Sequence, residues 1–202
     1  MKFKKIAISG KANSGKNTLC ELIKSKWNFS SANYAFADTI KEIALQIFPQ
    51  LDKNILWGPS HLRETKIPNL EFWGLEKGSM TYRELLCKLG EQNKLIFGDD
   101  VWVNTIFYRV KSHYYANNPN HLTIISDIRF KNELKMCKNE NFLLVRIKRD
   151  NVQQINRKNH ISELDLNDIR DEDFDVIIEN SSGIDNLKLQ AQALFNTWID
   201  GK

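Results

Sequence analysis

The sequence predicts an α/β domain in which a parallel sheet of about five strands is flanked by helices. Two observations carry this prediction. Short apolar runs of strand length alternate along the chain with longer segments whose apolar residues recur at helical spacing. A glycine-rich loop, "GKANSGK" at residues 10–16, stands directly between the first apolar run and the first helical segment. Strands that are joined through helices favour a parallel sheet covered on both faces.

The first two strands and helices follow from local patterns. Residues 4–9, "KKIAIS", form a predicted strand, and residues 17–27 form an amphipathic helix after the glycine-rich loop. A second strand is predicted at residues 32–37. The helix that follows at residues 38–48 ends at Pro49, because proline interrupts the hydrogen bonding of a helix.

The middle of the chain departs from this alternation. Residues 50–80 are rich in proline, glycine and tryptophan and show no clear periodicity. Two helices are then predicted, at residues 82–97 and 101–115, with no strand between them. We expect a helical insertion at about residues 50–119 that binds an acceptor substrate.

The C-terminal part returns to alternating strands and helices. Strands are predicted at residues 122–127, 142–149 and 174–180, and helices at 129–139 and 183–199. The polar segment at residues 150–173 is predicted to form a short lid. The sequence thus predicts a single domain, with its core at residues 1–49 and 120–202.

Composition limits the function classes. The net charge of +4 is mild, and no basic run resembles an arm that binds nucleic acid. No segment reaches the roughly 18 apolar residues needed to span a membrane, and the N-terminus does not read as a signal peptide. Cys20, Cys87 and Cys137 lack metal-ligand spacing and are expected to be reduced thiols. We expect a cytoplasmic protein that holds no metal through its own side chains.

The glycine-rich loop has the pattern of a phosphate-binding loop. Gly10 and Gly15 frame it and Lys16 follows, in the strand–loop–helix context that makes this motif specific. Backbone N–H groups of such a loop face phosphate oxygens, and the helix N-terminus adds partial positive charge. Lys16 would then bridge the β- and γ-phosphates of ATP. The alternative is an ordinary glycine-rich turn with an exposed lysine.

The residue after Lys16 departs from the usual pattern. A Ser or Thr at this position ligates magnesium directly in many nucleotide-hydrolysing enzymes, but this chain has Asn17, and the hydroxyl comes one place later at Thr18. We interpret the shift as the mark of a nucleoside monophosphate kinase, by resemblance to that group, in which Thr18 holds the α-phosphate.

Four charged residues stand where predicted helices or strands begin or end. Asp127 ends a hydrophobic strand, where parallel sheets present ligand-binding groups, and it is predicted to hold a magnesium-bound water. Arg129 and Arg83 are placed in the first turns of predicted helices, where a cation gains nothing from the helix dipole. Asp38 ends the second strand and is either a helix cap or a ligand. For Asp127 the alternative is also a helix cap.

No nucleophile, base and acid set is present. A phosphate acceptor is already ionised at neutral pH and needs none; positive charge around two polyanions suffices. That charge is predicted to come from Lys16, Lys41, Arg83, Arg129, Arg149 and Arg157. His160, in "HISE", has no metal-binding partner nearby and is expected at the surface.

The order of these motifs resembles a known family. "GKANSGKNT", "FADTIKE", "YRELLCKLG", "SDIRFKNE", "IKRD", "HISE" and "FDVIIEN" look like the deoxynucleoside monophosphate kinases of tailed bacteriophages, which have a P-loop kinase fold. The resemblance covers nearly the whole chain except residues 50–80. It implies transfer of the ATP γ-phosphate to a deoxynucleoside monophosphate with Mg²⁺, held mainly by phosphates and waters. It leaves open whether the protein forms a homodimer, which base it prefers and which host it comes from. A phage-encoded kinase of this kind would lie in the cytoplasm of the host.

The resemblance also implies site residues. ATP would be bound by Gly10, Asn13, Ser14, Gly15, Lys16, Asn17 and Thr18. The acceptor would be bound by Asp38, Lys41, Arg83, Lys94, Trp102, Arg129 and Glu133. Catalysis would rest on Lys16, Asp127, Arg129, Arg149 and Arg157.

Two features depart from the family. Members often have Asp at the position of Asn17, and Lys94 stands in place of an arginine, although a lysine is a point charge rather than a bidentate fork. Two other functions remain open: another small-molecule kinase, such as a phosphomevalonate or dephospho-coenzyme A kinase, and a nucleotide-binding regulatory module without an acceptor.

Overall fold

The computed structural model describes residues 4–115, 120–149 and 169–200. The chain divides into two compact units, which are described separately below. The sheet unit comprises Met1–Ala35 and Ile106–Lys202, and the helical unit comprises Phe36–Thr105. The helical unit therefore begins before the insertion predicted at about residue 50. The acceptor-binding role expected of that insertion stays a prediction.

The sheet unit is built on five parallel strands in the order β2-β3-β1-β4-β5. Its strands are β1 (Lys5–Ser9), β2 (Ser31–Tyr34), β3 (Leu122–Ile128), β4 (Leu143–Lys148) and β5 (Val176–Glu179). Among its described residues, the helices are α1 (Lys16–Ser25), the part of α5 (Val101–Tyr115) from Ile106 onward, α6 (Lys131–Asn139), the short η3 (Asp171–Asp173), α8 (Gly183–Leu194) and the π-helical η4 (Phe195–Asp200). The predicted α/β fold with a parallel five-stranded sheet is confirmed and is consistent with a P-loop kinase-like fold.

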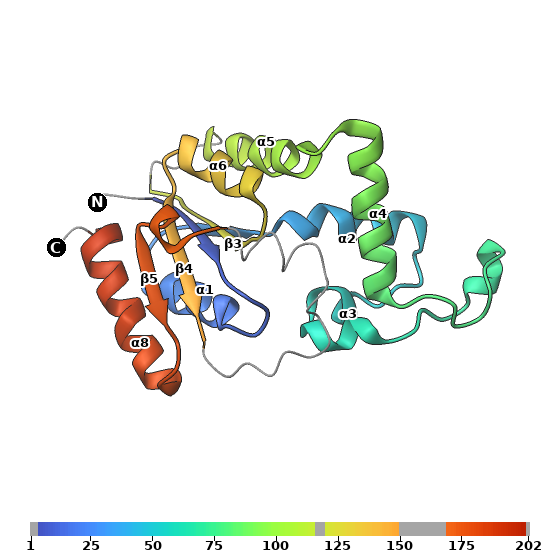
Figure 1. Ribbon diagram of the computed structural model, residues 1–202, viewed down its shortest axis with the longest axis horizontal. Helices are drawn as coiled ribbons and strands as arrows, with labels where there is room; N and C mark the ends of the chain where they lie inside the picture. Colours follow the sequence, from blue (N-terminus) through green and yellow to red (C-terminus); the bar gives the residue numbers. More distant parts are fainter. Residues whose placement is uncertain (1–3, 116–119, 150–168, 201–202) are drawn as a thin grey trace. The chain divides into compact units, whose positions relative to one another are not determined.

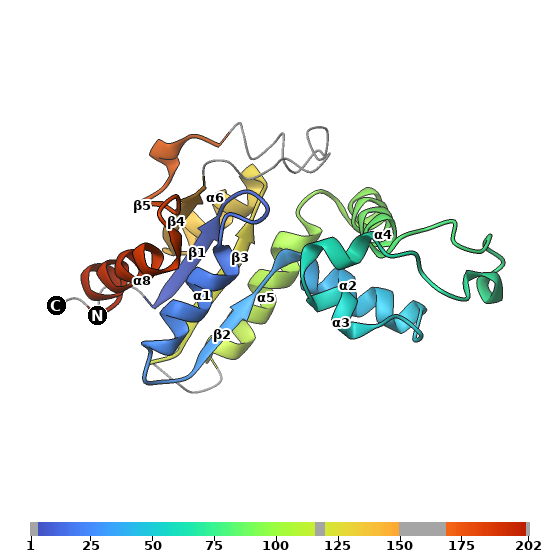
Figure 2. The same cartoon turned by 90° about the horizontal axis from the view of Figure 1, so that it is seen from below.

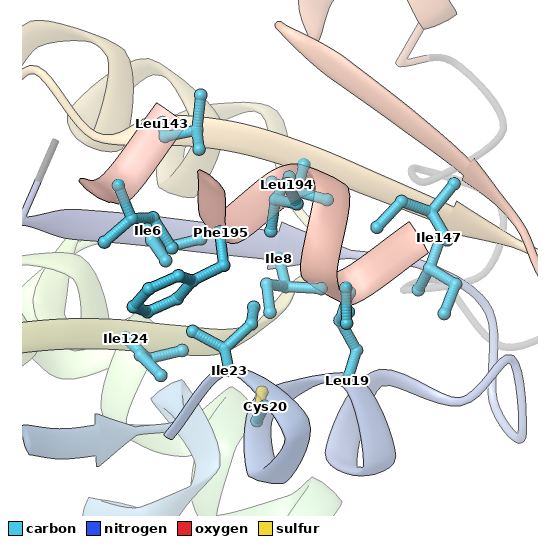
Figure 3. Packing of buried hydrophobic residues seen from close by; sticks show 14 of the residues in the cluster. Ile6, Ile8, Leu19, Cys20, Ile23, Ile124, Leu143, Ile147, Leu194 and Phe195 are labelled. Atoms are coloured by element: carbon cyan, nitrogen blue, oxygen red, sulfur yellow. The ribbon is translucent and has the colours of Figure 1, made fainter. Parts of the chain in front are cut away.

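Helices cover both faces of this sheet. Figures 1 and 2 show α1 and α8 on one face and α6 on the other. Between the sheet and the first pair of helices lies a large apolar core, in which Phe195 packs among isoleucines and leucines (Figure 3). Trp27 meets the Phe195 ring edge-on, with the ring centroids 6.1 Å apart, within the range of roughly 4.5–7 Å that is typical of such pairs. This burial fixes the ends of the strands that carry the site.

The helical unit has its own core. Its elements are α2 (Phe36–Ile47), α3 (Lys53–Trp57), η1 (Ser60–Glu64), η2 (Leu70–Trp73), α4 (Tyr82–Phe97) and the first part of α5 (Val101–Tyr115). Tyr82 is central to this core, and its hydroxyl accepts a hydrogen bond from the Asp52 backbone N–H at 3.0 Å. The predicted capping box of Thr81 and Glu84 begins α4. The segment without periodicity is thus folded around buried side chains.

Strand order defines where a ligand can bind. The connection from β1 through α1 to β2 runs to one side of β1, whereas the connection from β3 through α6 runs back past β1 to β4. Because α1 and α6 lie on opposite faces of the sheet (Figure 2), the chain leaves the neighbouring carboxyl ends of β1 and β3 toward opposite faces. This is the switch point at which open α/β sheets bind their ligands.

Among the boundaries that differ from the predictions, three change the element in which a particular residue lies. Helix α2 begins at Phe36, so the predicted strand at residues 32–37 ends early and Asp38 lies in the first turn of a helix rather than at its cap. Helix α6 begins at Lys131, so Arg129 precedes it. The last helix changes to π geometry at Phe195, where the aromatic side chain packs into the core.

Candidate functional site

The glycine-rich loop joins β1 to α1 in a tight, closely packed turn. A Cβ on Gly10 would lie 2.5 Å from the Ile147 carbonyl oxygen, so only glycine fits there. Gly15 has a φ of 105°, in the region that favours glycine, and it directly precedes the helix. Asn13 also has a positive φ, of 61°. Both predicted glycines are therefore required by the shape of the loop.

Lys16 places its ammonium group inside this turn. Its Nζ donates to the carbonyl oxygens of Gly10 at 2.6 Å and of Lys11 at 2.9 Å, and its side chain is only 9% exposed. The same Nζ lies 3.7 Å from Oδ1 of Asp127, at the end of β3. The alternative of an exposed lysine on an ordinary turn does not describe this geometry.

The first turn of α1 carries features that suit an anion. It holds no acidic residue, and Gly15 provides no side-chain cap, so the first N–H groups and the positive end of the helix dipole are uncompensated by a carboxylate. Asn17 and Thr18 are both exposed at this end of the helix. Ser14 is buried, and its hydroxyl has no hydrogen-bond partner among the described residues. A buried polar group of this kind is common where a ligand binds.

Asp127 and Arg129 complete the charged cluster at the ends of β1 and β3. Arg129 Nε donates to Asp127 Oδ2 at 3.0 Å, while Asp127 Oδ1 faces Lys16. The backbone N–H groups of Arg129 and Phe130, just before α6, donate to Glu133. Ser9 Oγ donates to the Ile128 carbonyl at 3.0 Å and ties the two strand ends together. One carboxylate thus lies between two cations at the carboxyl ends of these strands.

Glu133 is buried and holds the segment that carries Arg129. Its Oε2 accepts hydrogen bonds from the backbone N–H groups of Arg129 at 2.7 Å and Phe130 at 3.1 Å. Burial raises the pKa of Glu133 to about 8, although these two hydrogen bonds favour the charged form and oppose the rise. With a side chain that is 5% exposed, Glu133 positions the loop rather than presenting itself to a substrate.

The end of β4 carries further basic residues. Arg146 Nη1 donates to the Ile169 carbonyl at 2.6 Å and pairs with Asp171, to which Lys148 also donates. The hydrogen bond from Lys148 lowers the pKa of the Asp171 carboxyl. Arg149 follows the strand and is exposed. The predicted Arg157, His160 and most of the predicted lid at residues 150–173 lie outside the described residues.

Two of the predicted acceptor residues pair within the helical unit. Lys41 Nζ donates to Asp38 Oδ1 at 2.9 Å, one turn along α2. The same ammonium lies 5.5 Å from the centroid of the Trp57 ring, whose side chain is partly exposed. A cation and an aromatic face at one place could contact a phosphate and a base, respectively.

Two other predicted acceptor residues have partners that explain their positions structurally. Arg83 donates to Glu64 and, at 2.9 Å, to the Ser60 carbonyl, so it joins α4 to η1. Trp102 is buried, and its indole N–H donates to the Gly90 carbonyl at 3.2 Å, which joins α5 to α4. Lys94 is half-buried in the last turn of α4.

The sequence analysis did not identify one residue that contacts the glycine-rich loop. Asn180 follows β5, is buried, and donates from Nδ2 to the Ser14 carbonyl at 2.8 Å. The sequence feature that could have indicated it is a polar residue at the carboxyl end of a predicted strand, which is also the feature that indicated Asp127.

Fold and site together define an α/β protein with a candidate phosphate-binding loop at the switch point of a parallel sheet. The chain matches no family model. It is 24% identical over 193 residues to a protein of Acanthamoeba polyphaga mimivirus described as "Putative deoxynucleotide monophosphate kinase", with 92% of each chain covered. A crystal structure of a Thermus thermophilus protein aligns over 95% of this chain and 96% of that one, at 12% identity and a TM-score of 0.43.

Two further properties concern the part of the chain that the structure describes. None of the helices described is both long enough and apolar enough to cross a membrane. Within the same residues, no three side chains of His, Cys, Asp or Glu gather closely enough to hold a metal ion by themselves.

Proposed function

We propose that this chain is an ATP-dependent kinase that phosphorylates deoxynucleoside monophosphates to diphosphates. The observation that carries the proposal is the meeting of Lys16 with Asp127 and Arg129 at the carboxyl ends of β1 and β3. The description of the mimivirus relative and the resemblance to phage kinases support the same reaction class.

The loop and the N-terminus of α1 would bind the triphosphate of ATP. Backbone N–H groups of Gly15, Lys16 and Asn17 would face phosphate oxygens, and Lys16 would exchange its two carbonyl contacts for the β- and γ-phosphates. Thr18, exposed one residue further along the helix, would hold the α-phosphate. These contacts would bring the γ-phosphate beside Asp127 and Arg129.

The transfer itself would need positioning and positive charge. An ionised oxygen of the acceptor monophosphate attacks the γ-phosphorus in line, the bond to the β–γ bridging oxygen breaks, and ADP leaves. Lys16 and Arg129 would stabilise the charge that spreads over the transferred group. No base is required, because the attacking oxygen carries no proton at neutral pH.

The residues present fit a magnesium ion bound to ATP. Asp127 offers a partly exposed carboxylate beside Lys16, and carboxylate oxygen and water are the ligands that Mg²⁺ prefers. Bound there, the ion would neutralise charge on the β- and γ-phosphates. Asp127 would hold one of its waters, and Asn17 would be at most an indirect contact.

The acceptor is proposed to bind the helical unit. Lys41, paired with Asp38, would bind the acceptor phosphate, and the exposed part of the Trp57 ring would stack on the base. Arg83 and Lys94 would add positive charge.

Product analysis tests this proposal. The protein is incubated with ATP, Mg²⁺ and each of the four deoxynucleoside monophosphates in turn, and the nucleotides are separated chromatographically. We expect equal amounts of ADP and a deoxynucleoside diphosphate with at least one acceptor. ATP binding without any diphosphate product would instead favour a regulatory nucleotide-binding module.

A further inference from the structure

The outer side of the glycine-rich loop is packed against the carboxyl ends of two strands. Gly10 lies against Ile147 of β4, where an added Cβ would come within 2.5 Å of the carbonyl oxygen and 2.8 Å of the side chain. Gly15 lies against Asn180, where an added Cβ would come within 2.5 Å of Nδ2. The loop therefore has contacts on this side that leave no room for a methyl group.

Asn180 is itself held firmly in place. Its backbone N–H donates to the Lys148 carbonyl at 2.7 Å, which extends the pairing of β5 with β4 by one residue. Its side chain is buried, and Nδ2 donates to the Ser14 carbonyl at 2.8 Å across a sequence separation of 166 residues. A rigid sheet end thus supplies a fixed donor to one peptide group of the loop.

That peptide group is the one between Ser14 and Gly15. In a planar trans peptide the C=O and the following N–H point in opposite directions. Because the Ser14 carbonyl is held by Asn180, the Gly15 N–H must point away from Asn180, toward the other side of the loop. The Gly15 N–H is one of the groups that a phosphate at the start of α1 would use.

We propose that Asn180 is a positioning residue for triphosphate binding, which it supports by holding the Ser14–Gly15 peptide in the orientation that presents the Gly15 N–H. This inference rests on the proposed function, since it assigns the loop to the phosphates of ATP. Asn180 acts through the loop and does not itself contact the nucleotide.

A matched control exists on the neighbouring helix. Gln190 of α8 binds both backbone groups of Glu179, the residue before Asn180, at 3.2 Å and 2.7 Å. Gln190→Ala therefore weakens the attachment of the end of β5 without removing a contact to the loop. Asn180→Ala removes the contact to the loop. Asn180→Asp keeps the shape of the side chain but replaces the amide group that donates to the Ser14 carbonyl with a carboxylate oxygen, which cannot donate.

The first measurement uses the protein without nucleotide. Amide hydrogen exchange of the peptide covering residues 10–19 is followed by mass spectrometry. We expect Asn180→Ala and Asn180→Asp to accelerate exchange in this peptide about tenfold, because a buried hydrogen bond is lost, and Gln190→Ala to leave it within about twofold. Unchanged exchange in both Asn180 variants would overturn the inference and leave the proposed function standing.

The second measurement separates positioning from stability. Steady-state kinetics should show KM for ATP raised about tenfold or more in Asn180→Ala, with KM for the acceptor within about twofold of wild type. A merely structural role would lower the melting temperature and leave KM for ATP unchanged, as expected for Gln190→Ala, and that result would contradict the inference. If the wild-type protein does not bind MgATP at all, the proposed function fails, and the positioning role fails with it.

Discussion

Replacing Lys16 is the sharpest test of the loop's role. Lys16→Ala removes a cation whose Nζ lies 2.6 Å and 2.9 Å from two loop carbonyls and 3.7 Å from Asp127. In the reaction this cation would face the β- and γ-phosphates in a largely enclosed site. Loss of one such preorganised group costs about 3 kcal/mol or more in the barrier, which corresponds to roughly a 150-fold fall in kcat/KM.

The same substitution should leave the fold intact. Two hydrogen bonds to carbonyl oxygens are lost, each worth about 1 kcal/mol, and Asp127 keeps its Arg129 partner at 3.0 Å. The assay is steady-state ADP release with the best deoxynucleoside monophosphate, together with thermal unfolding of each variant. Lys24→Ala is the matched control, because Lys24 is on the same helix but pairs with Glu21 at its other end. If Lys16→Ala retained a third or more of the wild-type kcat/KM, the loop would have no part in the mechanism.

Three further outcomes are expected for residues around the loop. Arg129→Ala should lower kcat/KM about a hundredfold, and Arg129→Lys should recover only part of it because a lysine lacks the guanidinium fork; wild-type kinetics in Arg129→Ala would make that residue structural. Asn17→Ala should cost less than about tenfold in kcat/KM and Thr18→Ala more, since only Thr18 is proposed to contact a phosphate; kinetics at varied Mg²⁺ in the reverse order would show that Asn17 is the important contact. Burial raises the pKa of Glu133 from 4.5 to about 8, so the unfolded chain loses this proton first as the pH rises. The free energy of unfolding should therefore be highest, as far as Glu133 is concerned, below pH 4.5 and fall until about pH 8. Glu133→Gln should flatten this slope in urea unfolding at pH 5 to 8, and an unchanged slope would mean that other groups cause it.

Local patterns in the sequence determined the elements of the fold. The strand, loop and helix around Gly10, Gly15 and Lys16 were predictable because the spacing of these residues and the apolar runs beside them form a local pattern. The capping box of Thr81 and Glu84 was predictable for the same reason, since both of its hydrogen bonds span three residues. Alternation of strands and helices was likewise enough to predict a parallel sheet.

Boundaries were predicted less well where a distant or buried side chain decides them. Arg129 was placed in a helix because its neighbours have helical spacing, but Glu133 takes up its N–H and the helix begins at Lys131. Phe36 was assigned to a strand, yet its side chain is buried at the start of α2. In both cases burial overrides local propensity.

The contacts that make the site were decided only by the tertiary structure. The strand order places β1 between β3 and β4, which brings Asp127 to Lys16 and Ile147 against Gly10. The approach of Asn180 to Ser14 depends on β5 lying beside β4. The sequence alone names the residue types and the strand ends at which they stand. It does not show which strand ends are neighbours, because each strand's apolar pattern would suit several positions in a sheet that is buried on both faces.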